Sequence, residues 1–293
     1  MMPSSKDWLR HFRIANQNIS ITARHRTYAA YIEPFVRLYE SVQNATDISF
    51  DFLSNGQQQY LILNGQHELW QGNSAPETVA AFEIQLYTQI IQHIYPQFLS
   101  LHAGCIAKEG EAWMFAGQSG AGKSSMTTAA LLNDCQYMTD EFSLLTENGN
   151  ISPMPRPMQW DEPEHPAFPH QMMLKSACFE REFFTFPDFK GMDTQLQLWL
   201  PTHVQHQNLP LTHLVFPRFD ASSPPSQLSP LRRSAALMQL AQHFHHNILP
   251  SERIQLLNQR IPENIQAFQL VFSDVHAAWE QLTAYATSFK NDS

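Results

Sequence analysis

Residues 112–132, AWMFAGQSGAGKSSMTTAALL, decide the fold that the sequence predicts. The chain contains ten glycines, and three of them, Gly117, Gly120 and Gly122, fall within this stretch. Residues 117–124, GQSGAGKS, match the pattern G-x-x-x-x-G-K-[ST] at every fixed position. An apolar strand-like run precedes the pattern and a helix-like run follows it. This context indicates a phosphate-binding loop rather than an ordinary turn between a strand and a helix.

Each residue type in this loop has a physical role in holding a triphosphate. Glycine adopts unusual backbone conformations at little cost and lets main-chain N–H groups approach the anion. The following helix presents its N-terminus, which carries unpaired N–H groups and a partial positive charge, to the same phosphates. Lys123 is predicted to reach the β- and γ-phosphates of ATP, and Ser124 to place its hydroxyl on Mg²⁺. The predicted nucleotide-binding residues are Gly117, Gln118, Ser119, Gly120, Ala121, Gly122, Lys123, Ser124 and Ser125.

Two adjacent acids follow the next strand-like run. In QYMTDEFSLL, residues 136–145, these acids are Asp140 and Glu141. One carboxylate at such a strand end is suited to hold Mg²⁺, and its neighbour to accept a proton. A solvated turn is the alternative, but the position after the glycine loop favours a site. The predicted metal ligands are therefore Ser124, Asp140 and Glu141.

Several single residues allow two interpretations. His102, in SLHAGCIA, is either a packed, hydrogen-bonded strand residue or a catalyst. Arg156 stands between two prolines on a stiff segment, where it is either a phosphate clamp or a surface arginine. Trp160, in the same proline-rich stretch, is expected to anchor the loop. Arg218 and Arg232 are expected at the surface.

Two histidine groups raise the question of a metal site. They are THVQHQ, with His203 and His206, and HFHH, with His243, His245 and His246. Neither group has cysteines nearby or a matching carboxylate pattern. We therefore expect solvated or partly packed histidines.

Composition excludes some function classes and favours a cytoplasmic protein. The net charge of −9 argues against general nucleic-acid binding, which relies on clustered Lys and Arg. An apolar run long enough for a membrane span is absent from the sequence, and the N-terminal charges precede no signal-like apolar run. The cysteines, Cys105, Cys135 and Cys178, are widely spaced and predict reduced thiols.

The chain is predicted to form two domains, an α+β region over 1–95 and a nucleotide-binding domain over 96–293. In the first we expect helices over 26–42 and 74–95 and strands over 47–53 and 59–65. In the second we expect two strands joined by a turn within 98–117, and two proline-broken loops over 153–169 and 216–230. The remaining expected elements are strands over 212–216 and 267–273 and helices over 231–244 and 274–289.

Residues 101–145 resemble the catalytic core of bacterial HPr kinase/phosphorylase. That family has a histidine on the strand before the glycine loop, as His102 is here, and paired acids after the loop helix. The chain is most similar to the HPr-kinase-related proteins of type A, through PRP at 155–157, FPR at 216–218 and the basic pair 232–233. The family has a second aspartate where this chain has Glu141. It also has an LEIRG-type signature, which this chain lacks, so the resemblance implies neither HPr as the acceptor nor phosphorolysis.

The resemblance implies an α/β fold with a P-loop core like that of HPr kinase and ATP-dependent phosphoenolpyruvate carboxykinase, in which a mixed sheet is flanked by helices. It implies that Asp140 is the base toward the acceptor hydroxyl, that Glu141 helps to hold the metal and that His102 lies near the phosphates. By the same carry-over, Asp140, His102, Lys123 and Arg156 are the catalytic residues. A homo-oligomer is compatible with the family.

The expected function is that of an ATP- and Mg²⁺-dependent kinase acting on a hydroxyl, that of a Ser or Thr of a protein or peptide. Two alternatives stay open: a small-molecule kinase on the same scaffold, and a nucleotide-dependent binding module with little turnover. Neither a nucleic acid nor a membrane is an expected partner.

Overall fold

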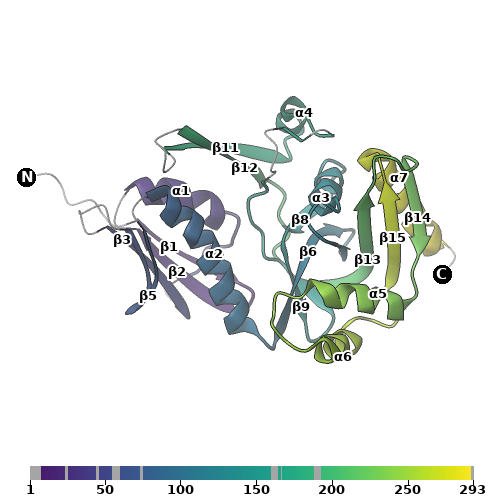
Figure 1. The fold of residues 1–293 in the computed structure, drawn as a ribbon, viewed down its shortest axis with the longest axis horizontal. Coiled ribbons are helices and arrows are strands. Elements are labelled where there is room, and N and C mark those ends of the chain that lie inside the picture. The colour runs from purple at the N-terminus through teal and green to yellow at the C-terminus, as the bar shows by residue number, and fades with distance from the viewer. Residues whose placement is uncertain are drawn as a thin grey trace, which may run out of the picture. The chain divides into compact units, whose positions relative to one another are not determined.

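The computed structural model describes residues 8–23, 26–43, 46–54, 60–72, 75–159, 164–165, 167–187 and 193–291, and it has a mixed α/β fold (Figure 1). The chain divides into two compact units, residues 1–95 with 181–200, and residues 96–180 with 201–293. The break after residue 95 lies where the sequence predicts it. Residues 181–200 differ from the prediction, because they group with the first unit and not with the second.

The first unit is built on a five-stranded sheet in the order β1-β2-β3-β4-β5. Only β2 and β3 run parallel, and the helix α1 connects them. The aromatic ring of Phe82 on α2 contacts Phe50 and Phe52 on β3 edge-on, at centroid distances of 5.9 and 5.0 Å. This buried cluster joins helix to sheet. The bounds are β1 Trp8–Ile14, β2 Gln17–Ala23, α1 Arg26–Val36, β3 Ile48–Ser54, β4 Tyr60–Asn64, β5 His67–Gly72 and α2 Ala75–Ile94.

A two-stranded ladder of β11 (Phe179–Pro187) and β12 (Asp193–Pro201) supplies residues 181–200 of this unit. Arg37, just after α1, forms an ion pair with Glu182 on β11 at 3.0 Å. The contact is remote in sequence, so local periodicity gives no sign of it. This explains why the sequence assigns the segment to the wrong unit.

The second unit contains a mixed sheet in the order β10-β9-β6-β7-β13-β15-β14, with β8 paired to β6. Strand β7 runs antiparallel to β6 and parallel to β13, which in turn runs parallel to β15. Strands β6 and β7 are buried along almost their whole length, as expected of central strands covered on both faces. The bounds are β6 Phe98–Lys108, β7 Glu111–Ala116, β8 Gln136–Thr139, β9 Phe142–Thr146, β10 Asn150–Ser152, β13 Leu209–Phe219, β14 Ser226–Pro230 and β15 Gln266–Phe272.

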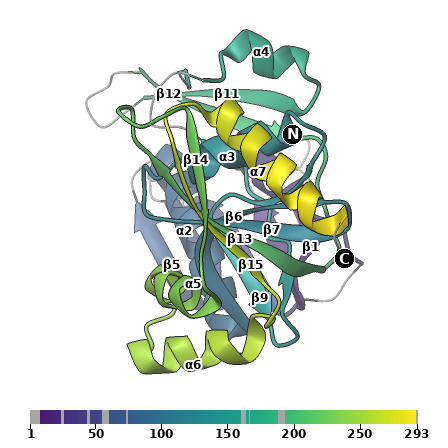
Figure 2. The ribbon, with the colours of Figure 1, turned by 90° about the vertical axis from the view of Figure 1, so that its right-hand side faces the viewer.

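Helices α3 and α7 pack beside each other in this unit, with α3 against β6, β7 and β8 and α7 against β14 and β15 (Figure 2). Helix α5 packs against β15 and α6. The α6 end is fixed by the buried Arg260, which donates to the backbone oxygens of Pro96, Gln97 and Leu145. The bounds are α3 Lys123–Leu131, α4 His170–Lys175, α5 Arg233–Leu240, η1 Ala241–His243, α6 Pro250–Arg260 and α7 Val275–Asn291.

The second predicted loop, 216–230, is wrong in part. Strand β13 extends to Phe219, and β14 pairs antiparallel with β15. Strand β14 lies at the end of the sheet order, and Pro230 is its last residue. An edge strand tolerates proline because its outer N–H groups have no ladder partner. The proline content therefore predicts a loop where the structure has the strand β14.

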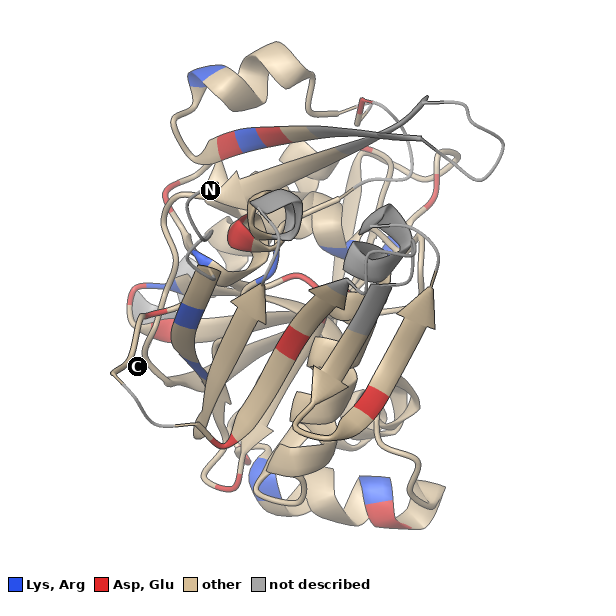
Figure 3. Cartoon of the chain, turned by 90° about the vertical axis from the view of Figure 1, so that its left-hand side faces the viewer, with Lys and Arg blue, Asp and Glu red and all other residues tan. Residues whose placement is uncertain are grey.

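Charge distribution and helix hydropathy are two further features of the described residues. In the view of Figure 3, the Lys and Arg residues of the described ribbon lie scattered among acidic residues and form no continuous basic stripe. Within the described residues, none of the helices combines the length and the apolar character that crossing a membrane requires.

Candidate functional site

The glycine loop, residues 117–122, joins the end of β7 to the first residue of α3. Gly120 and Gly122 have φ values of +76° and +96°, a left-handed conformation that side chains with a Cβ rarely adopt. A Cβ at Gly117 would lie 2.9 Å from the Cβ of Ala121, so here the constraint is space. The three glycines are thus needed for conformation or for close approach, as the motif predicts.

Lys123, at the first turn of α3, folds back over this loop. Its Nζ donates to the carbonyl oxygens of Gly117 at 2.9 Å and Gln118 at 3.1 Å. Burial lowers the pKa of Lys123, while the nearby carboxylates of Glu141 and Asp140 act in the opposite direction. The ammonium group is therefore held at the mouth of the loop, beside the acids that the sequence predicts.

Ser124 and Asp140 are brought together from two separate motifs. The Ser124 hydroxyl donates to Oδ2 of Asp140 at 2.9 Å, and Oδ1 of Asp140 is buried without a hydrogen-bond partner among the described residues. Burial raises the pKa of Asp140 to about 6, against the lowering effects of Arg156, of the Ser124 hydrogen bond and of Lys123. The carboxyl group therefore titrates close to neutral pH.

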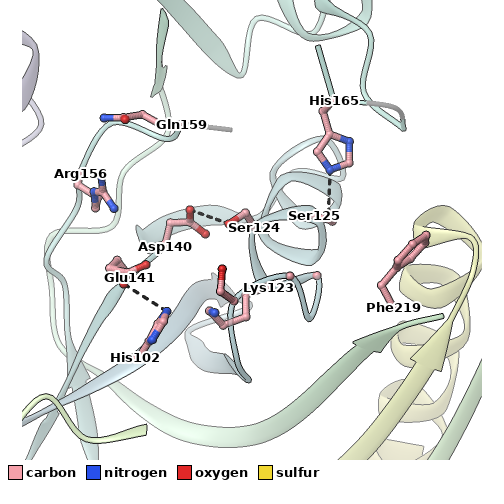
Figure 4. Close-up of a pocket in the computed structure, with 13 residues that line it drawn as sticks. His102, Lys123, Ser124, Ser125, Asp140, Glu141, Arg156, Gln159, His165 and Phe219 are labelled. Atoms are coloured by element: carbon pink, nitrogen blue, oxygen red, sulfur yellow. Dashed lines mark hydrogen bonds and ion pairs between the residues drawn. The ribbon is translucent and has the colours of Figure 1, made fainter. Parts of the chain in front are cut away.

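Glu141 takes a different partner from its neighbour. Its Oε1 lies 3.2 Å from Nε2 of His102 on β6 (Figure 4). Burial alone would raise the pKa of Glu141, but the hydrogen bond and charge of His102, with Arg156 and Lys123, outweigh it and lower the pKa. The two adjacent acids therefore have different partners, since Asp140 contacts Ser124 and Glu141 contacts His102.

A pocket of about 390 Å³ surrounds these groups. This volume lies in the range of small-molecule sites. The predicted residues that line it are Ser119, Gly120, Gly122, Lys123, Ser124, Ser125, His102, Asp140, Glu141 and Arg156. Gly117, Gln118 and Ala121 do not line it. Instead, the carbonyl oxygens of Gly117 and Gln118 accept hydrogen bonds from Lys123 Nζ. The carbonyl oxygen of Ala121 accepts one from the Phe219 N–H at 3.1 Å.

Three further lining residues, Gln159, His165 and Phe219, are not predicted by the sequence. Nε2 of His165 lies 2.8 Å from the Ser125 hydroxyl, and burial lowers its pKa. Phe219 follows the FPR stretch and is 52% exposed. The one sign of these residues in the sequence is their position within the two proline-rich segments. Their contacts with the site join segments far apart in sequence, so motif spacing does not reveal them.

Other predicted candidates lie elsewhere. Arg218 and Arg232 are exposed and do not line the pocket, as expected. Arg233 has a structural role, since its guanidinium donates to backbone oxygens of Asn258, Ile261 and Pro262 around the end of α6. Trp160 lies outside the described residues.

The HFHH segment lies closer to the candidate site than the sequence indicates. His245 is packed, as one alternative predicts, but its ring stacks on His102 at a centroid distance of 5.7 Å and contacts Phe142 at 4.9 Å. Burial, together with the charge of His102, lowers the pKa of His245 to about 4. His245 therefore borders the candidate site.

In comparisons with known proteins, no family model matches the chain and no curated protein matches it significantly.

Proposed function

We propose that this chain is an ATP- and Mg²⁺-dependent kinase with a P-loop core of the HPr kinase and phosphoenolpyruvate carboxykinase type. It transfers the γ-phosphate to a hydroxyl group, that of a Ser or Thr on a protein or peptide. The observation that carries the proposal is the hydrogen bond of 2.9 Å between Ser124 and Asp140. It joins the loop motif to the acid motif beside Lys123, as metal-assisted phosphoryl transfer requires.

The residues fit a magnesium–triphosphate group in three respects. Gly120 and Gly122 line the pocket at positive φ and carry no side chain there, so the loop presents main-chain atoms to it. The buried Oδ1 of Asp140 lacks a hydrogen-bond partner among the described residues, which suits an acceptor that completes its bonding with an ion or a bound water. The Ser124 hydroxyl and the Asp140 carboxylate are oxygen donors, which Mg²⁺ prefers.

Bound Mg²⁺ would offset charge on the phosphates during transfer. The chain itself supplies the remaining functions. Lys123 and the N–H groups at the start of α3 bind and polarise the phosphates. Arg156 and His102, on the pocket wall, add positive charge or hydrogen-bond donors near the transferred group.

Asp140 is the group that accepts the proton of the acceptor hydroxyl. A general base works best when its pKa lies near the working pH, and the pKa of Asp140 is raised to about 6. This role would distinguish the chain from a module that only binds nucleotide, in which Asp140 would only hold Mg²⁺.

Phe219 provides a surface for the nucleobase. Figure 4 shows it on the opposite side of Lys123 from Arg156 and Gln159. Its ring is supported edge-on by Phe272, at a centroid distance of 5.9 Å, and remains 52% exposed. An exposed, supported aromatic ring beside a phosphate loop is suited to stacking on a planar base.

The direct test is incubation of the purified chain with γ-labelled ATP, Mg²⁺ and cell extract, followed by identification of the labelled species. We expect label on a protein or peptide hydroxyl, and loss of that label with Asp140→Asn. Label in the low-molecular-weight fraction would support the small-molecule kinase instead. Equal labelling by wild type and Asp140→Asn would contradict the assigned base.

A further inference from the structure

A contact between His165 and Ser125 joins the proline-rich segment to the first turn of α3. Both residues line the pocket, and Nε2 of His165 lies 2.8 Å from Oγ of Ser125 (Figure 4). We propose that His165 is a positioning residue, whose Nε2–H group holds the Ser125 hydroxyl so that the hydroxyl proton is directed to the phosphate chain of the nucleotide. This inference rests on the proposed nucleotide function and adds a residue to it.

The hydrogen bonds of the imidazole decide which of its nitrogens carries the proton. The backbone N–H of Ala167 donates to Nδ1 of His165 at 3.1 Å, so Nδ1 is an acceptor and carries no proton. In a neutral imidazole the proton then lies on Nε2, the nitrogen that faces Ser125. Burial lowers the pKa of His165, which favours this neutral ring. Nε2–H is therefore the donor of the contact, and Oγ of Ser125 is the acceptor.

This direction leaves the Ser125 proton for another acceptor. A hydroxyl has one proton to donate, and among the described residues His165 is the only hydrogen-bond partner of Ser125 Oγ. The neighbouring hydroxyl of Ser124 differs, since it donates to Asp140 at 2.9 Å. Ser125 lines the pocket at the N-terminus of α3, where a helix favours phosphate groups. Its proton is thus suited to a phosphate oxygen, which accepts hydrogen bonds.

A buried anchor holds His165 in place. The Phe168 side chain is fully buried, and its ring contacts the His165 ring at a centroid distance of 4.9 Å. The Phe168 N–H donates to the His165 carbonyl at 3.1 Å, and the Phe168 ring meets His276 on α7 at 5.4 Å. On the other side, Oε1 of Glu164 accepts from the His170 N–H at 2.8 Å. Because the imidazole is already fixed, holding Ser125 costs little further freedom when nucleotide binds.

The test is a double-mutant cycle on the affinity for magnesium–ATP, measured by calorimetry with the full chain. Ser125→Ala should weaken binding by about tenfold or more, because it removes a hydrogen bond to a charged group, and His165→Phe by about three- to tenfold. Because His165 acts through Ser125, adding His165→Phe to Ser125→Ala should cause less than about a twofold further loss.

Two further variants separate this role from a general effect on folding. His165→Gln places an amide nitrogen as many bonds from Cα as Nε2 is, so it should restore most of the affinity that His165→Phe loses. The matched control is His206→Phe, which removes an exposed histidine outside the pocket and should leave the affinity unchanged. Circular dichroism would show that each variant is folded.

The imidazole nitrogens give a second readout that needs no nucleotide. In NMR spectra of the histidine side chains, the signals that are lost in His165→Phe should show a neutral ring with its proton on Nε2. A proton on Nδ1, or fully additive losses in the cycle, would overturn the positioning role and leave the kinase proposal intact. If the wild type binds no magnesium–ATP, the kinase proposal fails and the positioning role fails with it.

Discussion

At the scale of single residues, Asp140 shows how a carboxylate can be kept both buried and titratable. The fold removes it from water, and one hydrogen bond from Ser124 compensates for only part of its hydration. Burial is the largest influence on its pKa, which rises to about 6. A group arranged in this way makes the folded state less stable at neutral pH, a cost typical of functional sites.

This cost predicts a pH-dependent gain in stability for Asp140→Asn. The folded pKa of about 6 lies above the ordinary value of 3.8, so the folded chain binds the proton more tightly than the unfolded chain. The free energy of unfolding contributed by this group therefore falls as pH rises from about 4 to 6, and stays low above that range. The asparagine variant, measured by thermal unfolding without nucleotide or divalent ions, should exceed wild type at pH 7.5 by up to about 3 kcal/mol.

The gain should disappear near pH 4, where the wild-type carboxyl is also neutral in the folded chain. Glu147→Gln, a change at an exposed acid, serves as the control and should shift stability little at either pH. A folded Asp140→Asn variant that is less stable than wild type at pH 7.5 would show that the carboxylate is not penalised by burial.

Phe219 makes a separate prediction about the nucleobase. Phe219→Ala should weaken ATP binding by about tenfold, because stacking of a base on an aromatic ring contributes on the order of 1–3 kcal/mol. Binding of inorganic triphosphate, which has no base, should not change. Phe183→Ala, at another exposed phenylalanine, is the matched control. Equal losses for ATP and triphosphate, measured by calorimetry, would show that Phe219 supports the loop and does not contact the base.

At the scale of secondary-structure elements, the turn from β7 through the glycine loop into α3 is where sequence and structure correspond best. The motif requires left-handed and closely packed glycines, and both are present. Two features disfavour a side chain at Gly122. Its φ is +96°, and the Cζ of the Phe272 ring lies 2.6 Å from the position of an added Cβ. The end of β15 therefore helps to shape the loop.

Gly122→Ala and Gly110→Ala form a matched pair that separates the effect of positive φ from the effect of contact with Phe272. Both glycines have positive φ, but a Cβ at Gly110 would meet nothing within 4 Å. Gly110→Ala should cost about 1–2 kcal/mol through backbone strain alone. Gly122→Ala should cost more and should also weaken ATP binding, because Phe272 or the loop must move. Thermal unfolding and calorimetry would measure both effects, and equal destabilisation by the two changes would contradict a role for Phe272.

The sequence predicts this part of the molecule well because the constraints are local. Glycine spacing, an apolar strand and a strand-end acid pair are all visible within residues 112–141. His245 and His165 could not be predicted as neighbours of the site, since their positions depend on backbone pairing and folding contacts across long separations. The sequence does not predict strand β14, because its prolines indicate a loop, whereas a sheet edge tolerates proline.

At the scale of the whole molecule, the chain leaves its first unit after residue 95 and returns to it for residues 181–200. The return uses the β11–β12 ladder and the ion pair between Arg37 and Glu182. A boundary drawn from composition alone does not detect such a return, because the evidence for it is spatial. Every described residue that lines the candidate site belongs to the second unit.

The most direct measurement is calorimetric titration of the purified chain with magnesium–ATP, beside Lys123→Ala and the control Lys108→Ala. Lys108 is a partly exposed lysine that pairs with Glu109 at 3.2 Å, away from the loop. We predict one nucleotide per chain, a loss of about 10- to 100-fold in affinity for Lys123→Ala, because a charged hydrogen bond is removed, and no loss for Lys108→Ala. No binding by the wild type, or equal binding by wild type and Lys123→Ala, would contradict the account.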